Sequence, residues 1–195
     1  MEPIGFLFNW LISAQCFYYA TQLKSHKGRK TTQYWKWFFI LFGASTFFGG
    51  LSHLLFHYLG LTGKIPGWSL AILSMTALEL AVFYQIRRSK FQWFVWIQTV
   101  FIFSLIIVDF KFLWVSIQTA IGLVLVVGLV SLFQIKKGDR TWSGYLMGIG
   151  WMLASIPFVV GEIDFSIWFN RHDVSHIFMM LTLWQFFRTT RLVKA

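Results

Sequence analysis

Residues 112–134, FLWVSIQTAIGLVLVVGLVSLFQ, form a run of 23 residues without one charged side chain. A helix needs about 20 mostly apolar residues to cross the hydrocarbon core of a bilayer. The stretch is long enough to do so, and its apolar residues continue over its whole length. It therefore predicts a transmembrane helix, and the rest of the chain can be read by the same criterion.

Six further segments meet this criterion, and they lie on both sides of the first. Pro66 and Gly67 precede or open one of them, as suits a helix start, and Pro157 is expected to kink or stop another. The chain is therefore expected to be an all-α integral membrane protein, a seven-transmembrane-helix bundle forming a single domain over residues 1–195. The six segments are 5–23, 36–59, 67–86, 91–108, 142–160 and 166–187.

The overall composition agrees with a membrane protein. The chain is 57% hydrophobic and 12% charged, whereas soluble domains carry about 25% charged residues. The net charge of +10 would fit nucleic acid, but the basic residues fall in short clusters between apolar segments, so we expect no nucleic-acid partner. Cys16 is the single cysteine, which excludes an intrachain disulfide.

The basic residues predict the orientation. With seven spans, fourteen of the seventeen lie on one side, and only Lys64, Lys111 and Arg171 lie on the other. Cytoplasmic loops carry the excess of Lys and Arg, so the N-terminus is expected outside and the C-terminus in the cytoplasm, in a bacterial inner membrane. The fourteen are Lys24, Lys27, Arg29, Lys30, Lys36, Arg87, Arg88, Lys90, Lys136, Lys137, Arg140, Arg188, Arg191 and Lys194.

Tryptophans near the ends of the predicted spans indicate an aromatic belt at the membrane interfaces rather than a cofactor box. They include Trp35, Trp37, Trp93, Trp96 and Trp168.

Four of the five histidines converge in this topology. FGGLSHLLFH places His53 and His57 at the outer end of the second span, and RHDVSH places His172 and His176 at the outer start of the seventh. Each pair is spaced i, i+4, which puts both imidazoles on one helix face. Imidazole is the commonest metal ligand, and three protein ligands with an open position make a catalytic zinc site. The pattern predicts Zn²⁺ bound by these histidines, which otherwise are amphipathic side chains at the interface.

The acidic residues leave alternatives open. Asp173 can act as a zinc ligand, a general base or an orienting partner of an imidazole, or it can simply favour the N-terminal turn of its helix. Glu79, deep in the third span, is interpreted as a structural hydrogen-bonding group or a protonated acid. The roles of Glu162 and Asp164 stay open, as rim of a metal site or solvated loop residues.

The span layout with these histidines resembles the superfamily of alkaline ceramidases and adiponectin-receptor-like proteins. The resemblance implies a seven-helix bundle in which one histidine of the second span, His53 or His57, and the pair His172 and His176 bind zinc. It also implies a serine one turn before the first histidine. That position is His53 or Gly49 here, and Ser52 is adjacent.

The expected function is a zinc-dependent hydrolase that acts on a lipid amide or ester near the outer leaflet. A metal-bound water would attack an amphiphilic lipid substrate, with Asp173 as proton acceptor and Ser52 as a second catalytic candidate. The alternative is a receptor-like or binding bundle with a structural metal or a histidine cluster. A b-type haem ranks lower because the i, i+4 pairs duplicate ligands on one face, and retinal is disfavoured because the seventh span has no lysine. The oligomeric state is not assigned.

Overall fold

A computed structural model of the chain describes residues 3–23, 30–166 and 169–192, and its regular structure in these ranges is helical. Lys24, His26, Lys27, Arg29, Trp168 and Lys194 lie outside them. In chain order, the helices are α1 (Pro3–Gln22), α2 (Lys30–Leu54), α3 (Phe56–Leu59), η1 (Thr62–Lys64), α4 (Ile65–Gln85), η2 (Ser89–Phe91), α5 (Gln92–Asp109), α6 (Leu113–Ala120), η3 (Ile121–Gly128), α7 (Leu129–Lys136), η4 (Arg140–Trp142), α8 (Ser143–Ala154), α9 (Ile156–Val160) and α10 (Arg171–Leu192). The elements η1, η2 and η4 are 3-10 helices, and η3 is a π-helix.

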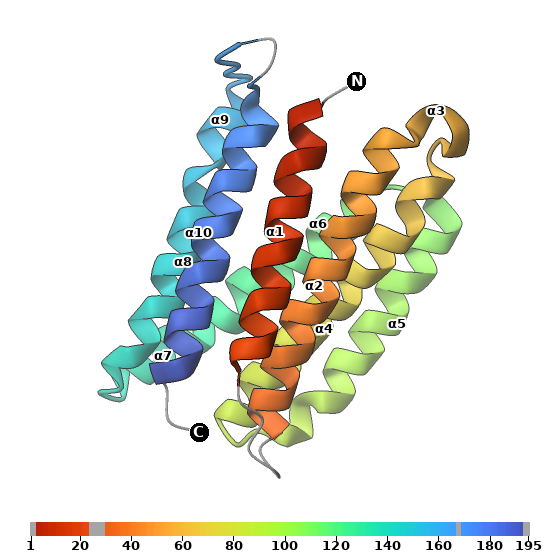
Figure 1. Cartoon of the computed structure of the whole chain (residues 1–195). Helices are drawn as coiled ribbons and strands as arrows, with labels where there is room; N and C mark the ends of the chain where they lie inside the picture. The colour runs from red at the N-terminus through yellow and green to blue at the C-terminus, as the bar shows by residue number, and fades with distance from the viewer. Residues whose placement is uncertain (1–2, 24–29, 167–168, 193–195) are drawn as a thin grey trace.

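The long helices run side by side as one bundle (Figure 1). Helix α1 packs against both α2 and α10, and α2 packs against α4. Helix α4 then contacts α5, α6 and η3, while α8 links η3 to α10 and so closes the arrangement. Helix α1 thus packs against both long helices that carry candidate histidines.

Five helical segments of the described chain are long and apolar enough to cross a membrane: Lys30–Leu54, Thr62–Gln85, Ser89–Asp109, Leu113–Lys136 and Arg140–Val160. The expected all-helical architecture with membrane-like helices is confirmed to that extent. Helices α1 and α10 fall outside this set. Helix α10 begins with Arg171, His172 and Asp173 and carries Arg188 and Arg191 in its last turns, so it has fewer consecutive apolar residues.

Two predicted segments are shifted along the chain at both edges. Helix α2 begins at Lys30 instead of 36 and ends at Leu54 instead of 59, because Leu55 leaves helical geometry with φ −97° and ψ 11°. Helix α10 spans Arg171–Leu192 instead of 166–187. The expected interruption at Pro157 is confirmed: α8 ends at Ala154 and α9 restarts at Ile156, since proline has no backbone N–H for the helical hydrogen bond.

Aromatic side chains build the core where α1, α2, α8 and α10 meet. Trp35 stacks on Tyr145 with ring centroids 5.3 Å apart, and Tyr19 stacks on Phe187 at 4.2 Å. Trp35 is therefore fully buried, and its assignment to an interfacial belt is wrong. Trp37, Trp93 and Trp96 are exposed, as an interfacial or lipid-facing position requires.

The two ends of the bundle differ in the charged residues that they carry. At the end that holds α3 and the first turns of α1 and α10, called the α3 end, lie the acids Asp109, Glu162, Asp164 and Asp173. The opposite end, called the basic end, contains the start of α2 and the end of α10 (Figure 1). Its basic residues in the described chain are Lys30, Lys36, Arg87, Arg88, Lys90, Lys136, Lys137, Arg140, Arg188 and Arg191.

Candidate functional site

The first turn of α10 is fixed by a reciprocal cap. The side-chain oxygen of Asn170 accepts hydrogen bonds from the backbone N–H groups of His172 at 2.8 Å and Asp173 at 3.3 Å. In return, Oδ2 of Asp173 accepts from the backbone N–H of Asn170 at 2.9 Å. This pattern is a capping box with Asn at the N-cap and Asp at the third helical position. It explains why the helix begins here and holds the Asp173 carboxyl in place.

The loop before α10 is tied to the same turn. The Arg171 guanidinium lies 3.4 Å from Oε2 of Glu162 and 3.6 Å from Oδ1 of Asp164, and its backbone N–H donates to Asp164 at 2.9 Å. Glu162 and Asp164 thus position the loop through Arg171, and their exposed carboxylates do so at the surface.

Two polar atoms near this turn are buried without a hydrogen-bond partner. Asp173 is only 1% exposed, and its Oδ1 atom has no partner, although Oδ2 takes part in the cap. One turn later, the Nδ1 atom of His176 is also without a partner. The His172 carbonyl interacts with the His176 imidazole, but no contact with hydrogen-bond geometry reaches Nδ1. Buried polar groups normally have partners, so such a pair calls for an explanation.

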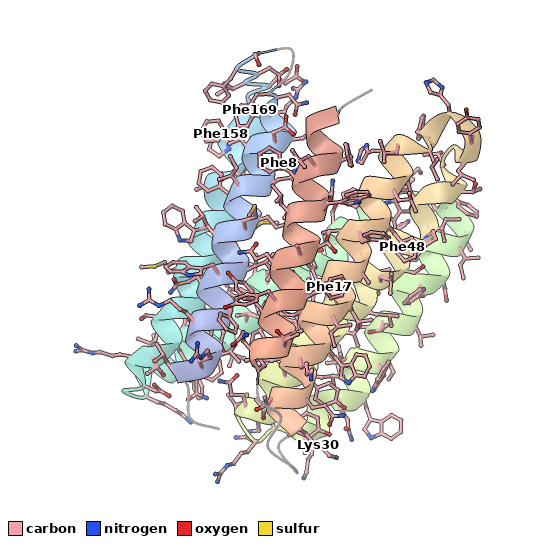
Figure 2. The ribbon with its side chains drawn as sticks, viewed as in Figure 1. Phe8, Phe17, Lys30, Phe48, Phe158 and Phe169 are labelled. Carbon is pink, nitrogen blue, oxygen red and sulfur yellow. The ribbon has the colours of Figure 1, made fainter. Side chains whose placement is uncertain are left out.

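The His176 imidazole is held between helices. Its ring is parallel to the Phe8 ring of α1, with centroids 6.1 Å apart. Phe8 also contacts Phe169, whose ring centroid lies 6.3 Å away. Figure 2 shows Phe8 and Phe169 near the same end of the bundle, away from Lys30. Aromatic packing therefore restricts the orientation of His176.

Three of the four predicted histidines come together with Asp173. The His176 imidazole interacts electrostatically with Asp173, His172 and His53, the last of which comes from α2. We call these four residues the His–Asp cluster. His53 and His172 are exposed, whereas Asp173 is buried and His176 is partly buried. The cluster therefore has a buried base on α10 and a more open side.

His57 is not part of the His–Asp cluster and lies on the next helix after His53. It is exposed on α3, beyond the interruption of the helix at Leu55. The prediction that His53 and His57 share one helix face assumed a continuous helix, and the structure contradicts that assumption.

Ser52 and its neighbourhood differ from a serine aimed at a histidine. Ser52 is 5% exposed and donates a hydrogen bond to the Gly49 carbonyl at 2.7 Å. At Gly49, one turn before His53, a Cβ would lie 3.5 Å from Oδ1 of Asn9. Asn9 is buried on α1, and its amide donates to the Gly5 carbonyl at 2.8 Å. An amide from the first helix thus lies where the resemblance expects a serine.

Sequence reasoning missed both Asn9 and Phe8. A polar Asn9 within an apolar helix was a visible signal, but only the packing of α1 against α2 shows that it meets Gly49. Phe8 gave no signal, because phenylalanine occurs throughout this chain.

The donor set suits a metal, but its geometry is not preformed. Imidazole nitrogen and carboxylate oxygen are the ligands of catalytic zinc sites. Within residues 3–23, 30–166 and 169–192, however, no group of three or more His, Cys, Asp or Glu side chains is arranged to hold a metal ion. The zinc assignment of His53, His57, His172 and His176 therefore stays a prediction.

Comparison with known proteins gives a family and no function. The family model described as a family of unknown function, DUF6962, matches residues 4–195. No curated protein and no solved structure matches the chain.

Proposed function

From a chain that belongs to DUF6962, a family of unknown function, we propose a seven-span membrane protein that binds one zinc ion at the His–Asp cluster. The observation that carries the proposal is the pair of buried, unpartnered atoms, Asp173 Oδ1 and His176 Nδ1, beside two further imidazoles.

The seven spans add α1 and α10 to the five apolar segments. These helices have 20 and 22 residues, which at 1.5 Å per residue is about 30 Å and matches the hydrocarbon thickness. The positive-inside rule supports placing the basic end in the cytoplasm. The α3 end, with the start of α1 and the His–Asp cluster, then faces the outside.

Zinc would satisfy the two buried atoms. A buried polar atom without a partner costs about 1–3 kcal/mol, and a bound ion removes that cost for Asp173 and His176 together. A third ligand would have to come from His53 or His172. Both imidazoles interact electrostatically with His176, and their side chains are exposed.

Hydrolysis of a lipid amide or ester is the second candidate function. One observation favours it: three imidazoles next to a carboxylate match the donor set of a zinc ion that keeps a water ligand. Such an ion activates water for attack on a carbonyl. The Asp173 carboxyl, next to His176, would accept the proton of that water. The amphiphilic lipid would enter from the outer leaflet.

The test is a zinc titration of chelator-treated protein. Wild-type protein should bind about one zinc ion. His176→Ala should weaken binding at least about tenfold, because loss of even a residue that only orients a metal ligand lowers metal affinity by about that factor. His57→Ala is the matched control and should bind like the wild type. Equal binding by the His176→Ala variant would overturn the proposed site.

Lipid hydrolysis is measured separately on the zinc-loaded protein. Release of fatty acid from lipid amides and esters should occur in the wild type and be lost in His176→Ala. Zinc binding without release from either class of lipid would leave the metal site in place and reject the hydrolase.

A further inference from the structure

The second fully buried carboxyl of the bundle, Glu79, belongs to a different polar network. Its Oε1 atom accepts hydrogen bonds from Nε2 of Gln98 on α5 at 3.1 Å and from Nε2 of Gln118 on α6 at 3.0 Å. The Gln98 amide also donates to Oε1 of Gln118 at 3.0 Å. Both amides thus converge on one oxygen of the carboxyl.

The other carboxyl oxygen of Glu79 receives no hydrogen bond. Oε2 of Glu79 is buried and has no hydrogen-bond partner. The described helices packed against α4 bring no charge to the carboxyl, whose side-chain partners are the neutral amides of Gln98 and Gln118. Titratable groups on these helices are Lys30, Tyr34, Lys36, His53, Lys64, Lys90 and Asp109.

This asymmetry fits a neutral acid. An ionised carboxylate in an apolar interior needs a counter-charge or donors for both oxygens. A neutral acid has one carbonyl oxygen, which accepts two hydrogen bonds, and one hydroxyl, which carries the proton. We propose that Glu79 is a reversible proton-binding site within the membrane, with Oε1 as the carbonyl oxygen and Oε2 as the proton-bearing atom.

A glycine on a neighbouring helix leaves space for the Glu79 carboxyl. At Gly122, a Cβ would lie 3.3 Å from Oε1 of Glu79 and 3.6 Å from Sδ of Met75, so a larger residue would crowd the carboxyl. Gly122 belongs to the π-helix η3, which begins three residues after Gln118. Short π-helical segments occur frequently at functional sites. Gln98 is only partly buried, so the network reaches from the interior toward the surface of α5.

The experiment is labelling of the full-length protein in membranes with dicyclohexylcarbodiimide, a reagent for protonated acids in apolar surroundings. The acid adds across a C=N bond: its oxygen bonds to the central carbon, its proton moves to nitrogen and no group leaves. Peptide mass spectrometry locates the label. We expect it on Glu79 and not on the exposed Glu162. Labelling should fall about tenfold per pH unit once the acid ionises.

A pair of variants separates proton binding from packing. Gln118→Met removes a donor that stabilises the ionised form more than the neutral one. The labelling curve should therefore move upward by about one pH unit. Gln92→Met, on the same helix as Gln98 but outside the network, is the control and should leave the curve in place. A folded wild-type protein with no label on Glu79, labelling that does not change between about pH 6 and about pH 10, or identical curves for the two variants would overturn the proposal.

Discussion

At the scale of single residues, Asp173 has two separable tasks. One oxygen completes the helix cap with Asn170, and the other is buried and unpartnered beside His176. The sequence alone left a capping role and a site role open for Asp173. One carboxyl can serve both, because the cap engages only one of its two oxygens.

Two substitutions at this position separate the tasks. Asp173→Ala should lower the free energy of unfolding by about 1 kcal/mol through loss of the cap, whereas Asp173→Asn keeps an acceptor for the Asn170 N–H and should cost much less. Both should weaken zinc binding because both remove the carboxylate. Thermal unfolding in detergent measures the first effect and zinc titration the second. Equal destabilisation by the two substitutions would mean that the cap does not carry the role assigned to it.

At the scale of helices, close packing between α8 and α10 depends on a glycine. A Cβ at Gly148 would lie 2.5 Å from the Phe186 ring, whose side chain is fully buried and cannot move away. The hydroxyl of Thr182 also donates to the Gly148 carbonyl at 2.9 Å. Small residues at helix interfaces allow such close approach within membranes.

Substitution of two glycines in α8 tests this contact. Gly148→Ala should destabilise the bundle by about 1–3 kcal/mol through overpacking. Gly150→Ala is the control, since a Cβ there meets nothing within 4 Å, and it should be neutral or stabilise by up to about 1 kcal/mol. The measurement is the unfolding midpoint of each purified variant. If Gly150→Ala lowers stability as much as Gly148→Ala, the packing argument is refuted.

The helices also show what sequence could and could not predict. Apolar runs placed four of the five apolar segments within five residues of their observed ends, and Pro157 marked a real interruption, since both signals are local. The end of α2 at Leu54 has no proline or glycine to mark it, and the π-helix within the apolar run 121–128 looks like ordinary helix. The burial of Trp35 depends on Tyr145, 110 positions away, and no local pattern carries that contact.

At the scale of the whole molecule, the separation of charge between the two ends is the basis of the proposed orientation. Basic residues gather where α2 begins and α10 ends, while the His–Asp cluster lies at the α3 end (Figure 1). The common depth of His53, His172 and His176 could be predicted, because it follows from helix direction alone. The place of α1 between α2 and α10 could not, since it depends on lateral packing.

Labelling of single cysteines tests the orientation. In a Cys16→Ala background, a membrane-impermeant maleimide should react in intact cells with Thr62→Cys at the α3 end. It should react with Ser89→Cys at the basic end only after lysis. Both positions are exposed. The reverse pattern would place the basic end outside and move the His–Asp cluster to the cytoplasmic side.

The most direct test of the central claim is elemental analysis of protein purified without chelator. The account predicts about one zinc ion per chain in the wild type and in His57→Ala. It predicts almost none when His53, His172 and His176 are all changed to alanine in a protein that remains folded. A wild-type protein without zinc that also fails to take it up, or a triple variant that retains it, would contradict the account.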